Sequence, residues 1–201
     1  MKRRKLGGND SVQDGSVRRT SFKNYSLAQL LSQDRSSCSF LVKGQPRPLE
    51  RARFNHSIKK MFNPSSKNQA EFRALIKEAL PLDEDKVPFF KRKENIIVDA
   101  VFKMKRPLSH YKPDTDVHGL GSDRLKESAP KLMYGGPKVD VDNLVKLVLD
   151  ALIGYIYEDD CQVVSIQSSK IYDSDDDCRG STVIKFRVAD EDELSVITNV
   201  H

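Results

Sequence analysis

Two aspartates one residue apart, Asp140 and Asp142, precede a stretch with helical apolar periodicity, and Lys146 lies one turn inside it. A second acidic group, residues 158–160, follows that stretch. Carboxylates held close together raise one another's pKa unless a cation neutralises them. Hard divalent cations such as Mg²⁺ take oxygen ligands, commonly one or two carboxylates plus substrate phosphate oxygens, and can activate water for phosphodiester hydrolysis. A nearby lysine would offset negative charge that develops on the phosphate.

The same residues also fit an ordinary capped helix. Apolar residues recur at i, i+3, i+4, i+7 and i+8, which predicts a helix from about residue 142 or 143 to just before Gly154: Leu144, Leu147, Val148, Ala151 and Leu152. Asp142, Lys146 and Asp150 then line up on the opposite side, as i,i+4 pairs worth only about a few tenths of a kcal/mol each. An aspartate before such a run is a common N-cap.

The capped-helix alternative does not explain Asp140, which precedes the helix. Nor does it explain residues 158–160, because acidic residues are poor strand formers and these three lie where the following strand begins. Side chains two apart along an extended segment share a face, so Asp140 is expected to point the same way as Asp142. If the strand after residue 160 paired beside the segment leading into Asp140, its first residues would lie near the helix N-terminus. Several carboxylates would then share one small region.

The remaining patterns predict an α+β fold, a small mixed sheet with two helices on one face, in the order β-loop-α-β-loop-α-β-β. Strands are expected at 39–44, 95–105, 162–172 and 181–188, the last two as a hairpin, and a first helix at about 67–80. Ser66 and Gln69 have capping-box spacing before that helix. Residues 44–67 read as an ordered basic loop, and 106–138 as a loop of a length that is usually functional or disordered.

Residues 1–37 hold eight Lys/Arg and three Asp/Glu and read as a disordered basic extension, with only SLAQLL as a short helical turn. Residues 38–190 would form the domain and 191–201 a C-terminal tail. The run MKRRK, with Arg18 and Arg19, is a nuclear address, a source of non-specific nucleic-acid affinity or part of a solvated tail, and the short motif favours the last. No apolar run approaches the length of a membrane span, so no membrane partner is expected. Three scattered cysteines favour an intracellular, reducing compartment.

Basic residues crowd the beginning of the domain against the single Glu50: Lys43, Arg47, Arg51, Arg53, Lys59 and Lys60. They suit a phosphate-rich partner, although a solvated charged surface is an equal alternative. Lys170 shares a strand face with Val164 and Ile166, the side on which the helices are expected to pack. It either extends along the sheet edge to water or reaches the acidic cluster. The acidic turn at 173–178 lacks calcium-loop spacing and reads as a solvated hairpin tip.

The segment VDVDNLVKLVLDAL, followed by EDDCQVV and then Lys170, resembles the signature of RusA-type Holliday junction resolvases, D-x-D-N-L-x-K, D-A-L, D-D-x-Q-V and a later lysine. GQPRPLERARF, MFNPSSK, RPLSHY and LKESAP resemble further segments of that family, so the resemblance spans roughly residues 40–188. Val139 stands where the family often has proline, which should alter loop stiffness but not ligand chemistry. Residues 1–37 lie outside the resemblance.

The resemblance implies a homodimeric, Mg²⁺-dependent endonuclease, with Mn²⁺ as a substitute, that cuts four-way DNA junctions by paired nicks in recombination and repair. Asp140, Asp142 and Asp160 would be the metal-binding carboxylates, and Lys146 would assist cleavage. The supporting residues would be Asn143 and Asp150, which shape the helix, Asp159, which supports the metal shell, and Gln162 and Lys170. The six basic residues would contact DNA phosphates. A non-catalytic nucleic-acid-binding module, or a phosphoesterase acting on other branched or flapped nucleic acids, would share these features.

Overall fold

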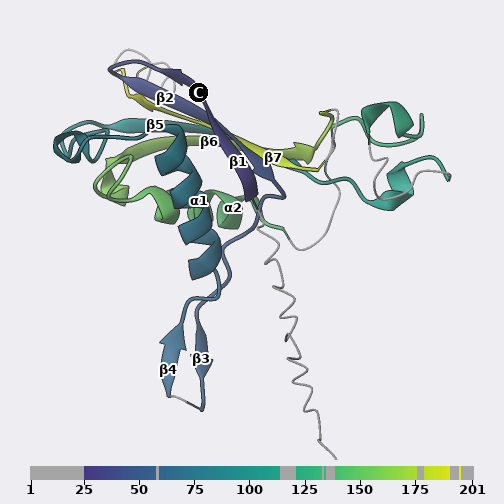
Figure 1. The fold of residues 1–201 in the computed structure, drawn as a ribbon, viewed down its shortest axis with the longest axis horizontal. Helices are drawn as coiled ribbons and strands as arrows, with labels where there is room; N and C mark the ends of the chain where they lie inside the picture. The colour runs from purple at the N-terminus through teal and green to yellow at the C-terminus, as the bar shows by residue number, and fades with distance from the viewer. Residues whose placement is uncertain are drawn as a thin grey trace, which may run out of the picture.

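A five-stranded mixed sheet carries both helices on one of its faces (Figure 1). The computed structural model describes residues 25–57, 59–113, 121–132, 134, 139–175, 179–190 and 195. The strand order is β1 (Tyr25–Gln33), β2 (Ser37–Gly44), β7 (Ser181–Val188), β5 (Ile96–Met104) and β6 (Val163–Tyr172). Only β5 and β6 run parallel within this sheet. The predicted α+β class with two helices on one face is confirmed.

The helices α1 (Ser66–Ala79) and α2 (Val141–Leu152) lie within a residue or two of their predicted ranges. The core forms between them and the sheet, and the whole predicted face of β5 is buried in it: Ile96, Val98, Ala100, Phe102 and Met104. Four single-turn 3₁₀ helices lie in the described connections, at Glu84–Lys86, Leu108–His110, Ser122–Arg124 and Asp160–Gln162. No helix in the described ranges has the length and apolar character needed to cross a bilayer.

The predicted capping box at the start of α1 is wrong. The N-cap is Ser65, not Ser66, and no side chain caps the helix. The Ser65 hydroxyl instead accepts a hydrogen bond from the Glu50 backbone N–H at 2.8 Å. Gln69 is likewise engaged elsewhere, because its amide accepts from Asn63 and donates to Asp150 on α2. These long-range hydrogen bonds replace the local capping pattern.

The prediction that β6 and β7 form a hairpin is wrong, because β5 lies between them. β6 pairs in parallel with β5, and β7 pairs antiparallel with both β5 and β2. The expected inward face of β7 is nevertheless right, since Thr182, Ile184 and Phe186 are buried. A strand's apolar alternation indicates which face is covered but carries no information about its neighbour.

The predicted extension at 1–37 is wrong for residues 25–37, where the chain forms β1 and the first residue of β2. SLAQLL is therefore a strand and not a helical turn. β1 is an edge strand, and among its residues only Tyr25 is fully buried. This one-sided contact explains why its composition resembles that of a solvated segment. Residues 1–24 and the predicted tail at 191–201, except Ser195, lie outside the described residues.

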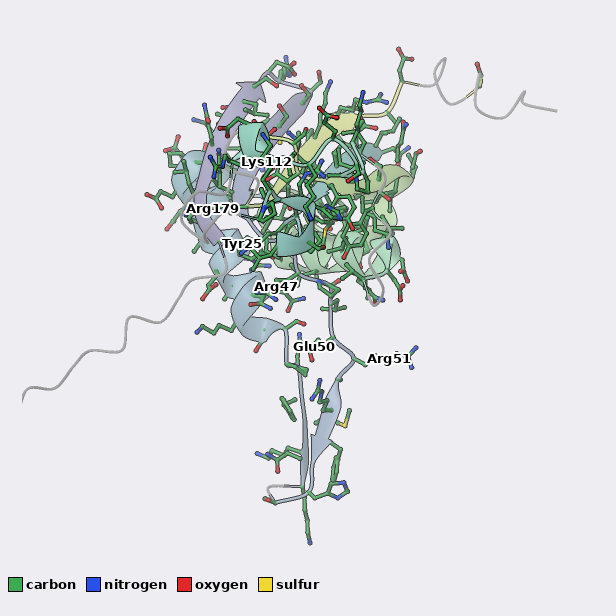
Figure 2. All side chains as sticks on the ribbon, turned by 90° about the vertical axis from the view of Figure 1, so that its right-hand side faces the viewer. Tyr25, Arg47, Glu50, Arg51, Lys112 and Arg179 are labelled. Atoms are coloured by element: carbon green, nitrogen blue, oxygen red, sulfur yellow. The ribbon has the colours of Figure 1, made fainter. Side chains whose placement is uncertain are left out.

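The predicted irregular loop at 44–67 contains a separate two-stranded hairpin, β3 (Arg53–Asn55) and β4 (Lys60–Phe62). Together with the two residues before β3 it extends away from the sheet and helices as an arm, residues 51–62 (Figures 1 and 2). Lys59, in its turn, has a positive φ of 51°. Three residue pairs make up its ladder. Gly and Pro in the flanking sequence obscured strands this short.

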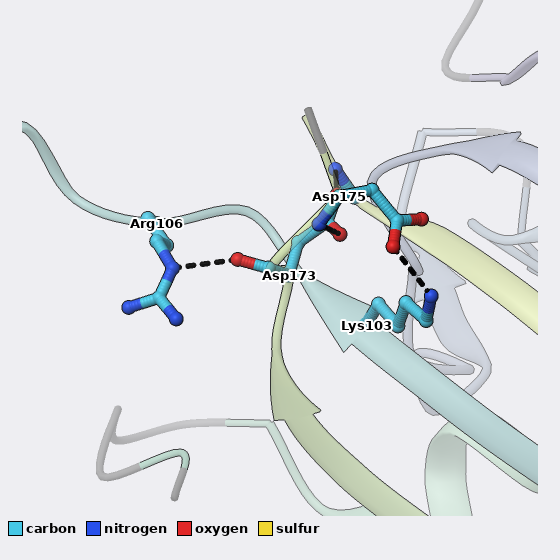
Figure 3. Close-up of polar contacts among 5 residues, drawn as sticks. Lys103, Arg106, Asp173 and Asp175 are labelled. Atoms are coloured by element: carbon cyan, nitrogen blue, oxygen red, sulfur yellow. Dashed lines mark hydrogen bonds and ion pairs between the residues drawn. The ribbon is translucent and has the colours of Figure 1, made fainter. Parts of the chain in front are cut away.

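The connection after β5 is fixed by a buried arginine, Arg106, which is only 2% exposed. Its guanidinium donates to the carbonyl oxygen of Asp173 at 2.6 Å (Figure 3). The same guanidinium donates to the carbonyl oxygens of Pro130 and Lys131, at 2.6 and 2.5 Å. It also lies over the Tyr172 ring, 5.2 Å from the centroid. One side chain thus ties two distant parts of the central connection to the end of β6.

The start of the β6–β7 connection is shaped by the buried Asp173 (Figure 3). Its carboxylate accepts from the backbone N–H of Gly180 at 2.6 Å and of Asp175 at 3.0 Å. Asp175 in turn pairs with Lys103 of β5 at 2.7 Å. Asp173 and Asp175 are therefore engaged in ordering the chain, in contrast to the predicted solvated tip. Residues 176–178 of that turn lie outside the described residues.

We expect Arg106→Leu to lower the free energy of unfolding by about 3 kcal/mol, because three carbonyls would lose a charged donor in a buried setting. Urea unfolding followed by circular dichroism measures the change. Lys93→Ala, which alters an exposed residue before β5, serves as control and should change stability by less than about 0.5 kcal/mol. Equal stability of Arg106→Leu and the wild type would contradict the anchoring role.

Candidate active site

An open groove of about 390 Å³ runs between α2 and β6. The acidic and basic residues of α2 that lie four apart, Asp142, Lys146 and Asp150, all line it, together with Asp160. Its apolar wall comprises Val141, Val145, Leu149 and Ile166, with Ser168 beside them. The predicted alignment of the three charged residues along one side of the helix is confirmed. We call this cavity the α2–β6 groove.

Asp140 and Asp142 occupy the beginning of α2. Asp140 is the N-cap residue in an extended conformation, so it lies off the helix as predicted, and its side chain makes no capping hydrogen bond. Its carbonyl accepts from the Leu144 N–H at 3.2 Å. Both aspartates are exposed, and the positive end of the helix dipole favours negative charge there. Asp142 lines the groove, whereas Asp140 is outside the set of residues that line it.

Asp160 lies beside the other end of α2. The Tyr157 hydroxyl donates to the Leu149 carbonyl at 2.9 Å and lies 3.4 Å from Asp160 Oδ1. Burial raises the pKa of Tyr157 strongly, and the negative charges of Asp160 and Asp150 raise it further. Asp150 and Asp160 therefore both act on one buried phenol. The contacts of that phenol locate Asp160 next to the last turn of the helix.

The expectation that β6 begins near the helix N-terminus is wrong, because β6 pairs with β5 and runs back along α2. Leu149, which marks the position of Asp160, is seven residues and so about 10 Å along the axis from Asp142. Within the described ranges, no three His, Cys, Asp or Glu side chains are grouped closely enough to hold a metal ion together. The groove therefore presents carboxylates at both ends, with Lys146 between them.

The donor chemistry of the groove suits a hard divalent cation. The side chains lining the groove that could bind a metal ion are the carboxylates of Asp142, Asp150 and Asp160, and no cysteine or histidine is among the lining residues. Mg²⁺ commonly takes only one or two carboxylates and completes its shell with waters and substrate phosphates. Either end of the groove offers that number. The residues thus fit a magnesium-type ion in chemistry, without three of them converging in the described arrangement.

Lys146 has little to hold it in place. Its Nζ lies 3.6 Å from Asp150 Oδ1, and its side chain is 60% exposed. Such an i,i+4 pair on a helix surface contributes only about 0.3–0.5 kcal/mol. Asp150 has a second contact, a 3.3 Å hydrogen bond donated by the Gln69 side chain of α1. The lysine can therefore leave its carboxylate at small cost, while Asp150 stays oriented.

Asp159 and Gln162 fix the turn that carries Asp160. Asp159 accepts from the Cys161 N–H at 3.0 Å, and this hydrogen bond lowers the pKa of its carboxyl group. The buried Gln162 accepts from the Glu158 and Asp159 N–H groups at 2.7 and 3.1 Å. Its amide donates to two carbonyls just before β5, of Lys91 and Glu94. Two of the motif residues, Asp159 and Gln162, therefore hold the backbone of the turn that carries Asp160.

Lys170 lies on the helix side of β6, opposite Phe102 of β5, as predicted. Its Nζ donates to the carbonyl of Val139, the residue before Asp140, and lies 5.3 Å from the Tyr134 ring centroid. It therefore reaches the segment that carries the acidic residues, by way of a backbone oxygen. Ile166, on the same face, is 47% exposed because β6 is an edge strand and the groove lies over it.

The six basic residues predicted to bind DNA divide into two groups. Lys43 is on β2 and Arg47 lies close to the buried Tyr25, whose pKa burial raises to about 12 against the opposing effect of Arg47. The other four belong to the arm, which leaves the body near the labelled Glu50 and Arg51 in Figure 2: Arg51, Arg53, Lys59 and Lys60. Arg53 pairs with Glu50 at 2.5 Å.

Sequence patterns missed several residues that build the groove. Tyr157 reads as part of a connection, yet it links Leu149 and Asp160. The sequence predicts Gln69 only as a capping-box residue, yet it contacts Asp150. Arg73, to which the sequence patterns assign no role, donates to the carbonyls of Ala151 and Ile153. The contacts that Gln69 and Arg73 make with α2 and its C-cap join residues 78–81 positions apart in the chain. The sequence therefore offered no local signal for them.

Comparison with known proteins shows what this chain is similar to. A family model described as Endodeoxyribonuclease RusA matches residues 43–179. The chain is also similar to "Uncharacterized protein YqaN" from Bacillus subtilis (strain 168), with 52% identity over 52 residues. That similarity covers 25% of this chain and 37% of the relative. The family match covers the arm, α1, β5, α2 and β6. All the groove residues lie inside it.

We expect the stability of the protein to fall above pH 10 partly through Tyr157. Its pKa is raised in the folded state, so the unfolded chain loses this proton first, near pH 10, as the pH rises. The contribution of Tyr157 to the free energy of unfolding is therefore fully present below pH 10. Above pH 10 it falls by about 1.4 kcal/mol per pH unit. Urea unfolding at pH 9, 10 and 11 should show a shallower decline in Tyr157→Phe. Identical slopes in the two proteins would contradict this.

Proposed function

Because this chain belongs to the RusA endodeoxyribonuclease family, we propose that it is a metal-dependent, structure-selective endodeoxyribonuclease that resolves four-way DNA junctions by paired nicks. The observation that carries the proposal is the α2–β6 groove, in which carboxylates at both ends flank a lysine. The family description supports endonuclease activity on DNA. The groove supports phosphodiester hydrolysis, because its charged residues match what that reaction requires.

Asp140 and Asp142 at the start of α2, and Asp160 beside its last turn, are the residues that would hold divalent ions, Mg²⁺ or Mn²⁺ in its place, at the two ends of the groove. When bound, such an ion supplies an activated water and stabilises the departing oxygen. Since Asp142 and Asp160 lie at opposite ends of the groove, each end would offer one or two carboxylates, the number that Mg²⁺ commonly takes. Asp159 and Gln162 would keep the Asp160 turn in place, as their backbone hydrogen bonds indicate.

Lys146 would bind the scissile phosphate from the middle of the groove. Its weak pairing with Asp150 leaves the ammonium able to turn toward an anion. A positive charge at that point would offset the negative charge that develops on the phosphate oxygens. Lys170 would act on the backbone instead, because its contact with the Val139 carbonyl fixes the segment that enters Asp140. Asn143 and Asp150 would shape the helix and its connection to α1 and the arm.

Paired nicks require two sites that face two strands of like polarity. One chain carries one α2–β6 groove in the described residues. A second copy related by two-fold symmetry would supply the second site, which is the commonest arrangement of soluble oligomers. We therefore propose a homodimer acting on branched DNA. Its basic residues, including those of the arm, would contact phosphates without reading sequence.

A non-catalytic nucleic-acid-binding module with the same fold is the second candidate. The basic arm favours it, because an arm that binds phosphates needs no metal. It predicts junction or duplex binding with steep salt dependence and no effect of Mg²⁺. A phosphoesterase for other branched or flapped nucleic acids is distinguished from a junction resolvase by a panel of labelled substrates.

We expect Asp142→Asn to lower the rate of junction cleavage at least about 100-fold, because losing an ion ligand removes several kcal/mol of charge stabilisation in the transition state. The assay uses a labelled four-way junction with Mg²⁺, and gel-shift binding without metal should be retained. Asp123→Asn, an exposed carboxylate outside the groove, is the matched control and should cleave normally. Absence of cleavage by the wild type with both Mg²⁺ and Mn²⁺, under conditions of demonstrated binding, would contradict the enzymatic proposal.

For Lys146→Met we expect a loss of about 10²–10³-fold in cleavage rate at saturating DNA, the magnitude typical of removing one stabilising group aimed at developing charge. Thermal stability should hardly change, because the lysine is exposed and weakly paired. Lys146→Arg should recover part of the rate, since it keeps the charge. An unchanged single-turnover rate in Lys146→Met would exclude a direct role for this lysine.

A further inference from the structure

The arm formed by β3 and β4 carries apolar side chains on an exposed projection. Phe54 pairs with Met61 across the ladder, and Phe62 pairs with Arg53. These three apolar side chains are 44–61% exposed, although isolated two-stranded hairpins are only marginally stable in water. His56 contacts the Phe54 ring edge-on, with centroids 5.0 Å apart. Nothing in the described part of the chain buries this surface.

The base of the arm is fixed to the candidate active site. The Leu49 N–H donates to the Asn143 carbonyl at 2.8 Å, and Asn143 follows Asp142 in the first turn of α2. The Glu50 N–H donates to the Ser65 hydroxyl just before α1. Six residues, from Glu50 to Asn55, precede the turn, and an extended chain of that length spans about 20 Å. The arm therefore projects far from the α2 N-terminus, while its base is hydrogen-bonded to the residue that follows Asp142.

The charge of the arm indicates what covers its apolar surface. Residues 51–62 include two arginines and two lysines and no acidic residue. Two such arms from a pair of chains would repel each other if their faces met. Nucleic acid instead offers phosphates for the cations and flat base faces for the aromatic side chains. Proteins that bind unpaired strands combine these two features, and others insert apolar wedges between base pairs.

We propose that the arm is a base-stacking probe for branched DNA, with Phe54 and Met61 packing on the base faces left exposed at the branch point and the arm's cations holding the adjacent phosphates. This rests on the proposed branched-DNA substrate. A continuous duplex has every base pair stacked on both sides, so inserting the arm there costs unstacking energy that a branch point does not require. The arm would thereby contribute selectivity for junctions over duplex.

The test compares binding of the full chain to a four-way junction and to a duplex of the same sequence, in EDTA so that no cleavage occurs. We expect the double variant Phe54→Ala/Met61→Ala to lose about tenfold or more in junction affinity, the loss typical of removing one base-stacking contact, with duplex affinity changed less than about threefold. Leu27→Ala/Leu31→Ala, on the exposed side of β1, is the matched control and should bind as the wild type. Lys59→Gln/Lys60→Gln should weaken both substrates alike and reduce the salt slope by about 2.

Photo-crosslinking locates the contact directly. With 5-iododeoxyuridine at the branch point, we expect a crosslink to the peptide that contains Phe54, and none when the label lies ten base pairs along an arm of the junction. Equal losses on junction and duplex in the apolar double variant, or unchanged junction binding, would overturn the proposal. So would sedimentation showing that this variant is monomeric where the wild type is dimeric, because the arm would then be a self-association element.

The catalytic proposal and the arm proposal fail separately. A protein that binds junctions selectively through Phe54 and Met61 but never cleaves them keeps the arm proposal and loses the nuclease. A protein that cleaves junctions with the wild-type rate and selectivity in the double variant keeps the nuclease and loses the probe. Absence of any DNA binding by the wild type would remove both.

Discussion

The parallel pairing of β5 with β6 is the constraint on which the groove depends. Parallel neighbours cannot be joined by a tight turn, so the chain must cross over between them, and α2 is that crossover. The helix consequently runs back along the sheet. Its beginning lies by Lys170, near the end of β6, and its last turn lies by Tyr157 and Asp160, just before β6 starts. The separation of the acidic residues follows from this path.

The groove stays open because β6 is at the edge of the sheet. The inner side of α2 is completely buried, and its charged side faces outward along β6. No further strand or helix covers this edge in the described ranges, which leaves Val164 and Ile166 nearly half exposed. The last carbonyl groups of a helix have no hydrogen-bond partner within the helix. At the end of α2, Arg73 of α1 donates hydrogen bonds to two of them. The helix is thus held firmly from one side while the other side is accessible to a large substrate.

The region matched by the family model ends before β7, yet β7 lies between β2 and β5. The match begins only at the last two residues of β2, so the matched region holds β5 and β6 but leaves β5 without its antiparallel neighbour. β1 lies outside it too, and adds Tyr25 to the core by edge-to-face contact with Phe72 of α1, at 5.4 Å between centroids. The recognisable family signature therefore covers the groove and the arm, whereas the sheet that supports them is completed by segments beyond it.

The helices, the buried faces of the strands and the line of charge along α2 could be predicted from the amino-acid sequence, because they depend on periodicities of 3.6 and 2 within a single element. The motif residues also identified the family. Which strands are neighbours, that residues 25–33 join the sheet, and that residues 51–62 form an arm all depend on the tertiary structure.

The tertiary structure also decided how the acidic residues are distributed. Asp140 and Asp142 are close in sequence and remain close, since they share the start of one helix. Asp160 is held at the other end by Tyr157, Gln162 and the pairing of β6. Strand pairing and contacts between residues far apart in the chain set that distance, and no local pattern encodes them.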